Sequence, residues 1–147
     1  VLDGIARQSN HPQYPRIMQE TQIARATLLS QWGRCSEAER LWHMLTSPPH
    51  TPERVWMQFL NHCSICRNLE EGERILDRLL PRGRLSLGFL DEAVLFTFSS
   101  GHPERARALL NRMERENGRN GKERAQSWRT RHPVLAAPGK PETAPRP

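Results

Sequence analysis

A cysteine pair beside a histidine is the first group in this sequence that could do chemistry. Cys63 and Cys66 are three residues apart, so on a helix both thiols would share a face, and His62 precedes them. A zinc site needs two further ligands, for which His43 and His102 are candidates. The pair has no second Cys-x-x-Cys half, and free cysteines commonly pack as small apolar residues. We therefore predict a packing role for the pair, with no bound metal or cofactor.

Sequence motifs for other kinds of catalysis are missing. The chain contains no GxSxG, no GxxxxGK[ST] and no HExxH. These motifs position a serine nucleophile, a nucleotide phosphate and a catalytic zinc ion, respectively. The sequence therefore predicts a protein that is not an enzyme.

A tryptophan among arginines is the second chemical signal. A ring such as that of Trp128 can stack on a base while neighbouring guanidinium groups contact phosphates. The predicted RNA-binding residues are Arg119, Lys122, Arg124, Trp128, Arg129 and Arg131. The alternative is that Trp128 covers the open apolar end of the preceding helices and that the arginines are solvated.

The distribution of charge also favours RNA binding by the segment that contains Trp128. The chain of 147 residues has a net charge of +6. Residues 117–147 hold seven basic and two acidic side chains, a net charge of +5, so residues 1–116 are nearly neutral. A basic segment with few apolar residues can become ordered on a polyanion.

A repeat of 34 residues organises the elements that must position these groups. A small residue recurs and is followed at +3, +4 and +7 by large apolar residues, which is one face of a helix. The recurring sets are Ala38, Gly72 and Ala106; Leu41, Ile75 and Leu109; Trp42, Leu76 and Leu110; and Leu45, Leu79 and Met113. Gly33, Arg67 and Gly101 precede them in the same register. We expect the small residue to lie where another helix comes close.

Each repeat also contains an earlier apolar segment, at 23–32, 55–65 and 89–98. Helix-start signals precede both kinds of segment: Ser36 with Glu39, Thr51 with Pro52, Asn68 with Glu71, Ser86, and Pro103 after His102. The predicted fold is all-α, an α-α superhelix (solenoid) of three helix-turn-helix repeats. The predicted parts are an N-terminal helix end and connector at 1–19, the repeats at 20–116, and an extended, basic, proline-rich tail at 117–147.

The second repeat resembles a pentatricopeptide repeat. Residues 59–80 read FLNHCSICRNLEEGERILDRLL, with paired apolar residues, a short polar turn and a Glu-Glu-small start to the next helix. The resemblance implies RNA binding in mitochondria or chloroplasts, with bases read at positions that fall on Ala24, Gln58 and Glu92. Tetratricopeptide repeats share the period of 34 residues and are the near alternative, although their Trp and Gly-Tyr signature is not found here.

Composition limits the cellular compartments in which the protein is expected. Three cysteines without a disulfide-framework spacing favour a reducing compartment. No window is apolar enough for a membrane span. Because the sequence begins at Val1 and not at methionine, we expect a processed or incomplete product whose targeting segment is not readable.

The function predicted from these observations is structural. We expect a component of an organellar ribonucleoprotein, with the mitochondrial ribosome first and a plastid particle possible. RNA, most simply ribosomal RNA, would bind the tail, and neighbouring proteins would bind the repeats, with no membrane and no small-molecule substrate. The alternative is a tetratricopeptide-type protein scaffold that does not contact RNA.

Overall fold

The computed structural model describes residues 14–136, which form eight helices and no strand within that range. In chain order these are α2 (Tyr14–Gln31), α3 (Cys35–Leu45), α4 (Glu53–Cys66), α5 (Leu69–Leu79), α6 (Leu87–Ser99), α7 (Pro103–Glu116), α8 (Gly118–Arg131) and α9 (Pro133–Ala136). The predicted all-helical class is therefore confirmed for the described residues. Among them, no helix combines the length and apolarity required for a membrane span.

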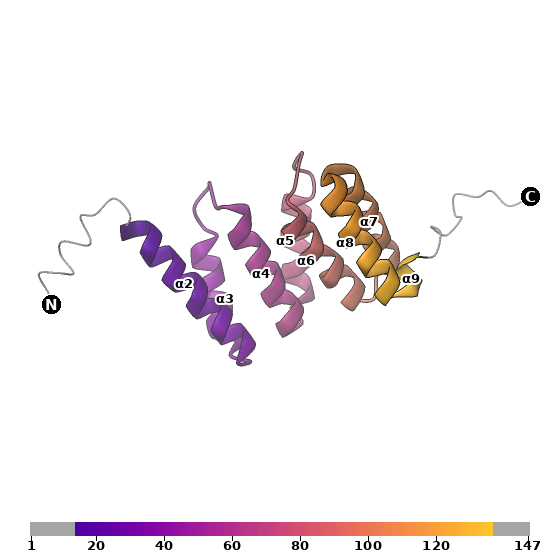
Figure 1. The fold of residues 1–147 in the computed structure, drawn as a ribbon. Coiled ribbons are helices and arrows are strands. Elements are labelled where there is room, and N and C mark those ends of the chain that lie inside the picture. The colour runs from indigo at the N-terminus through magenta and orange to yellow at the C-terminus, as the bar shows by residue number, and fades with distance from the viewer. Residues whose placement is uncertain (1–13, 137–147) are drawn as a thin grey trace, which may run out of the picture.

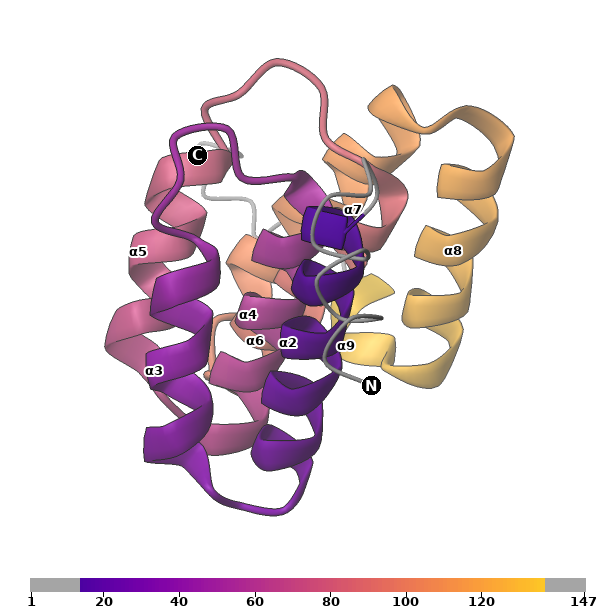
Figure 2. The same cartoon turned by 90° about the vertical axis from the view of Figure 1, so that its left-hand side faces the viewer.

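The helix pairs follow one another along the molecule, with α2 and α9 at opposite ends (Figure 1). α3 packs on α2, α5 packs on α4, and α7 packs on α6. Contacts between α2 and α4, between α4 and α6, and between α6 and α8 link one helix pair to the next. Viewed from the α2 end, α3 and α5 lie together on one side of α2, α4 and α6 (Figure 2).

The recurring apolar positions form the core, as predicted. Ala38 and Ala106 are fully buried, and Gly72 is buried at the same place in α5. Eight of the nine large apolar positions are also buried, and Leu41 packs against the core while partly exposed. Gly72 faces the ring of Phe96 on α6, so closely that a Cβ atom there would overlap the ring. The small residue thus lies where another helix comes close.

The turn inside each repeat has the same backbone conformation. Gly33, Arg67 and Gly101 have φ angles of 79°, 56° and 88°, which is the left-handed region. In each turn the next amide N–H donates to the carbonyl five residues before it: Arg34 to Leu29 at 2.9 Å, Asn68 to Cys63 at 3.0 Å, and His102 to Thr97 at 2.9 Å. This is the Schellman pattern that ends a helix. The sequence register therefore corresponds to a repeated local structure.

Three of the predicted helix starts are confirmed. The Asn68 side chain accepts a hydrogen bond from the Glu71 amide at 3.2 Å, the Ser86 hydroxyl accepts one from the Phe89 amide at 3.2 Å, and Pro103 is the first residue of α7. The Ser36 start is wrong, because α3 begins at Cys35 and its cap residue is Arg34. Ser36 consequently lies inside the first turn, where its side chain caps nothing.

The Thr51 start is also wrong. Pro52 is the cap residue of α4, and the Thr51 hydroxyl donates instead to the Pro48 carbonyl at 2.7 Å.

Two predicted segments differ from the structure. The connector assigned to 1–19 is wrong from residue 14 onward, because α2 begins at Tyr14; residues 1–13 lie outside the described range. The extended tail assigned to 117–147 is wrong for 118–136, where α8 and α9 pack on α7. Gly121 is buried against the Met113 carbonyl, so this glycine permits close packing of two helices and does not interrupt α8. Residues 137–147 lie outside the described range.

Candidate functional site

The predicted RNA-binding residues all lie on α8, and two of them form its main contact with α6. Arg124 donates two hydrogen bonds to Asp91, at 2.7 and 2.6 Å, and Trp128 Nε1 donates to the same carboxylate at 2.6 Å. Trp128 is only 5% exposed. Its ring is therefore not free to stack on a base, and the predicted stacking role does not fit this structure. The covering role, the alternative for Trp128, agrees with its burial.

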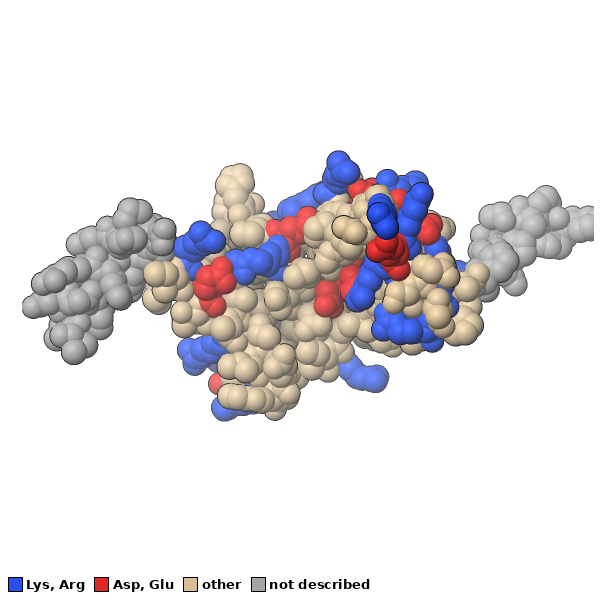
Figure 3. Space-filling model, in the orientation of Figure 1, with Lys and Arg blue, Asp and Glu red and all other residues tan. Residues whose placement is uncertain are grey.

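The other cations of α8 differ in how far they are engaged within the chain. Arg129 donates to Glu114 at 2.7 Å and to Asn111 at 3.2 Å. Arg119 pairs with Glu123 on the exposed surface, Arg131 lies 5.0 Å from the Trp128 ring, and Lys122 is exposed. Basic side chains gather around the α7 to α9 end of the molecule, with acidic ones between them (Figure 3). Arg119, Lys122 and Arg131 are the members of the predicted set that remain open to a ligand.

The positions that the pentatricopeptide resemblance assigns to base reading fall on three different helices. Ala24 is exposed on α2, whereas Gln58 on α4 and Glu92 on α6 are partly buried. The Glu92 carboxylate accepts hydrogen bonds from Asn61 Nδ2 at 3.3 and 3.1 Å. Burial raises the pKa of Glu92, and repulsion from Asp91 adds to this effect. The Glu92 carboxylate on α6 is thus hydrogen-bonded to α4, the first helix of the preceding repeat.

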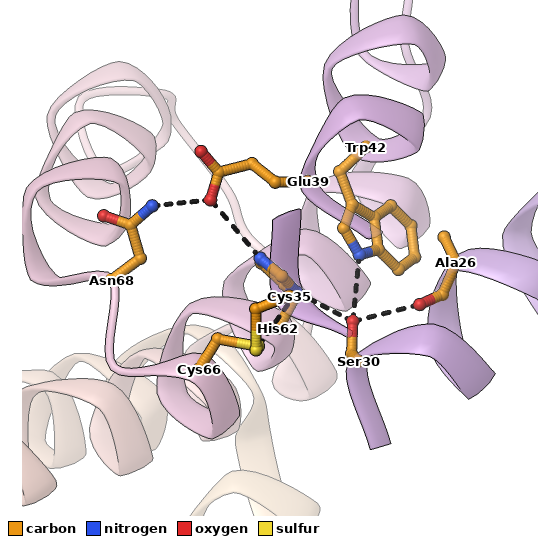
Figure 4. Close-up of a disulfide and its surroundings, with 8 residues drawn as sticks. All are labelled: Ala26, Ser30, Cys35, Glu39, Trp42, His62, Cys66 and Asn68. Atoms are coloured by element: carbon orange, nitrogen blue, oxygen red, sulfur yellow. Dashed lines mark hydrogen bonds and ion pairs between the residues drawn. A yellow bond between two sulfur atoms is a disulfide. The ribbon is translucent and has the colours of Figure 1, made fainter. Parts of the chain in front are cut away.

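A buried polar network lies where the first two repeats meet (Figure 4). His62 Nδ1 is 2.7 Å from the Ser30 hydroxyl, which accepts a hydrogen bond from Trp42 Nε1 at 3.4 Å and donates to the Ala26 carbonyl at 3.0 Å. On its other side, His62 Nε2 is 3.5 Å from Glu39 Oε1. Burial lowers the pKa of His62, while Glu39 opposes this shift. The network joins α2, α3 and α4 around one histidine.

The same network contains the residue types of a nucleophilic triad, but not its exposure. Ser30 is 2% exposed and His62 is 1% exposed. A substrate carbonyl must reach the hydroxyl of a catalytic serine, and the Ser30 hydroxyl instead donates to its own helix. Among the described residues, this serine and histidine therefore have a packing and orienting role.

A disulfide joins Cys35, at the start of α3, to Cys66, at the end of α4. Cys63 is free and buried, and burial raises the pKa of its thiol. The Cys63 and Cys66 pair therefore does not form a metal site here, because one sulfur is bonded to Cys35 and the other lies in the core. The disulfide also removes the argument for a reducing compartment, which depended on the lack of a disulfide pattern.

Three side chains close to this disulfide place potential metal ligands together. Ligand atoms of Glu39, His43 and Glu71 all lie within 4.8 Å of one another. His43 Nε2 is 3.4 Å from Glu71 Oε1 and 3.8 Å from Glu39 Oε2. Glu39 and His43 line a groove of about 420 Å³ that also contains the disulfide. Of the residues named for metal binding from the sequence, His43 lies in this cluster, and His102 is the residue that precedes the first turn of α7.

Sequence reasoning missed Glu39, Glu71 and the Cys35 to Cys66 bridge. The repeat offered a signal for the bridge: the two cysteines flank successive turns of the 34-residue register and are 31 residues apart. Consecutive turns stack in repeat proteins, so cysteines at this spacing come close in space. Glu39 and Glu71 were predicted as helix-start residues, and they meet the histidines only through side-chain contacts between α3, α4 and α5.

Comparison of the chain with protein-family models, with curated proteins and with solved structures gives no match.

Proposed function

We propose that this chain is a non-catalytic helical-repeat scaffold, a short α-α solenoid that holds neighbouring proteins of an assembly. The observation that carries the proposal is the repeated turn at Gly33, Arg67 and Gly101, with the same left-handed conformation and the same Schellman hydrogen bond in each copy. Helix pairs that repeat in this way stack on their neighbours and offer extended surfaces to partners.

The charge pattern supports a protein partner over RNA as the principal ligand. Arg124 and Arg129 are each hydrogen-bonded to a carboxylate of the same chain, and Trp128 is buried between helices. Side chains held in this way contribute less to phosphate or base contacts. The repeats themselves are nearly neutral, which suits a protein surface.

RNA association is the second candidate function, and exposed cations on α8 favour it. Arg119, Lys122 and Arg131 are exposed on one short helix. Such a group can neutralise a few phosphates and would fit a component of an organellar ribonucleoprotein, with the mitochondrial ribosome first and a plastid particle as the other possibility. In this candidate the repeats still bind neighbouring proteins.

Native purification of the tagged chain with its bound molecules distinguishes the two functions. The scaffold function predicts a protein partner in fixed stoichiometry that survives ribonuclease and survives replacement of Arg119, Lys122 and Arg131 by glutamine. The RNA function predicts loss of association in both treatments and a smaller salt dependence for the triple variant. A matched control replaces exposed arginines of α2 and α3, namely Arg16, Arg25 and Arg40. If no protein co-purifies in fixed stoichiometry, the scaffold function is wrong.

A further inference from the structure

The outer face of α2 carries a continuous, largely apolar stripe. Ile17, Thr21, Ala24 and Leu28, together with Trp32 just after the helix, recur every three or four residues, so they share one side of α2. All five are exposed; Ile17 is 56% exposed and Leu28 is 44% exposed. Single exposed apolar residues are ordinary on a protein surface, but a contiguous apolar patch is typical of an interaction site.

The same positions are buried in the two repeats that follow. Three stripe positions, those of Ile17, Thr21 and Leu28, recur at intervals of 34 residues in the second and third repeats. All six copies are buried: Thr51, Val55, His62, Leu85, Phe89 and Phe96. The repeat therefore uses these positions as interior positions wherever another repeat precedes them.

The contacts of two copies identify what covers them. His62 Nδ1 is 2.7 Å from the Ser30 hydroxyl on α2, and His62 Nε2 is 3.5 Å from Glu39 Oε1 on α3. Phe96 lies over Gly72 on α5. In both cases the covering surface belongs to the helix pair of the preceding repeat. Among the described residues no helix covers the equivalent face of α2, which lies at one end of the molecule (Figure 1).

The opposite end of the array is covered by the chain itself. There α8 and α9 pack on α7, and Trp128 and Leu135 are buried. Each repeat of a solenoid contacts only its neighbours, so a terminal repeat exposes the apolar surface that internal repeats bury. The face of α2 is thus the open end of this array.

The array also indicates which kind of surface fits this face. In the covering pair, a small residue of the second helix lies where a large side chain of the next repeat packs, as Gly72 does for Phe96. A second copy of this chain does not offer such a surface, because its small residues Ala38, Gly72 and Ala106 are already buried.

The remaining segments of the chain are too short to supply the pair. The pair formed by α4 and α5 runs from Glu53 to Leu79. Residues 1–13 and residues 137–147, which lie outside the described range, are each less than half as long. The observations therefore favour a helix pair from another protein.

We propose that the outer face of α2 docks a helix pair of a helical-repeat partner protein, which stacks on this chain as a further repeat would. This inference rests on the proposed scaffold function and names the surface and the class of partner. In the complex Leu28 would lie over a glycine or alanine of the partner's second helix, as Phe96 lies over Gly72. Ile17 and Trp32 would be buried toward the two ends of the contact.

A helix pair of known sequence provides the first test. A copy of residues 14–47, one period of the repeat, is inserted between residues 13 and 14 of the full chain, which keeps the register. We expect the melting temperature of this extended chain to exceed that of the parent by at least about 5 °C, because an added repeat that docks stabilises the array.

Substitution of the original Leu28 shows whether the gain comes from the α2 face. In the parent Leu28 is exposed, so Leu28→Glu should shift the melting temperature by less than about 2 °C. In the extended chain the same change should abolish the gain. Met44→Glu is the control and should leave the gain intact, because Met44 is 54% exposed and its copy Arg78 is exposed as well.

Native purification of the tagged chain provides the second test. A helical-repeat protein should co-purify with the parent and with Met44→Glu. It should be lost from Leu28→Glu and from the extended chain, whose α2 face is already covered. Sedimentation of the purified parent should find a monomer.

The outcomes separate this proposal from the scaffold function. An extended chain that gains no stability, or a gain that survives Leu28→Glu, overturns the docking face. A partner that stays bound to Leu28→Glu also overturns it but leaves the scaffold function standing. A parent dimer that Leu28→Glu dissociates would assign the face to a second copy and overturn the proposal. If no protein co-purifies, both the proposal and the scaffold function are wrong.

Discussion

Arg124 on α8 and Asp91 on α6 form a two-bond ion pair, at 2.7 and 2.6 Å, and the indole N–H of Trp128 donates to the same carboxylate. Asp91 thus receives three hydrogen bonds from a helix that follows the third repeat. Trp128 and Leu135 are buried by this contact and by the packing of α8 and α9 on α7. A basic segment with little apolar content therefore closes one end of the array, where unpaired apolar surface would otherwise remain.

Removal of Asp91 should destabilise the protein more than removal of Arg124. Asp91→Ala leaves the buried Trp128 N–H without a partner, which costs about 1–3 kcal/mol. Arg124→Ala removes a partly exposed ion pair, worth roughly 0.5–1 kcal/mol, and leaves the Trp128 hydrogen bond intact. Urea denaturation of both variants measures the difference. Equal losses in the two variants would mean that the indole N–H does not depend on Asp91.

The close contact between Gly72 and Phe96 makes a prediction that opposes helix propensity. In an exposed helix interior, Gly→Ala stabilises by about 1 kcal/mol. At Gly72 the added methyl group would overlap a ring that is fully buried, so we expect Gly72→Ala to destabilise by about 1–3 kcal/mol. Gly88→Ala is the control, because its neighbour is the flexible end of Met57 and the change should stay within about 0.5 kcal/mol. Thermal and urea unfolding give the sign.

The disulfide between Cys35 and Cys66 closes a loop with a sequence separation of 31 residues. In the chain-entropy description a loop of this size contributes about 3–4 kcal/mol, so Cys35→Ser should lower the free energy of unfolding by about that amount. Thiol titration of the denatured chain should find one free thiol, that of Cys63, and three after reduction. Three thiols before reduction would show that the bridge does not form.

The repeats could be predicted because their signal is local. Apolar residues at helical spacing, glycine at the turn and Asn68, Ser86 or Pro103 at a helix start each act within a few residues, and the structure follows them. The helix at 118–131 could not be predicted in this way. Its glycines are typical of a chain break, yet Gly121 is what lets α8 approach the Met113 carbonyl. Tertiary packing here overrides local preference.

The candidate metal cluster was beyond sequence reasoning for a related reason. Glu39 contacts His62 and Asn68, which are 23 and 29 residues away in the chain, and no periodic pattern marks an acidic residue that turns inward. Trp32 is the opposite case, because it belongs to the apolar segment 23–32 but lies just after α2 and is 67% exposed. Polar contacts between repeats follow from the way the helices stack, which spacing alone does not determine.

Glu92 should make stability depend on pH in a defined direction. Its pKa in the folded chain lies above the ordinary value of 4.5, chiefly through burial, so the folded state holds the proton more tightly than the unfolded state does. The resulting stability is fully present below the unfolded pKa and is lost as the pH rises through the folded pKa. Glu92→Gln should therefore be more stable than the parent at pH 7 and should lose that advantage near pH 4.

Urea denaturation at pH 4 and pH 7 measures this difference. Asp77→Asn, which neutralises an exposed carboxylate, is the control and should show no comparable gain at pH 7. A Glu92→Gln variant that is less stable than the parent at pH 7 would mean that the hydrogen bonds from Asn61 outweigh the cost of burying the charge.

Arg67 carries the strain that glycine avoids in the other two turns. Its φ of 56° is left-handed, as at Gly33 and Gly101, but a side chain in this region costs about 1–2 kcal/mol. Because Arg67 is exposed, Arg67→Gly should stabilise the protein by about 1 kcal/mol once the greater freedom of glycine in the unfolded chain is counted. Gly33→Ala and Gly101→Ala should each destabilise by a similar amount.

Arg67→Ala separates the effect of the backbone from that of the side chain. It keeps the strained conformation, so its stability should match that of the parent. If Arg67→Ala instead stabilises the protein as much as Arg67→Gly does, the cost at this position comes from the arginine side chain and not from the left-handed backbone.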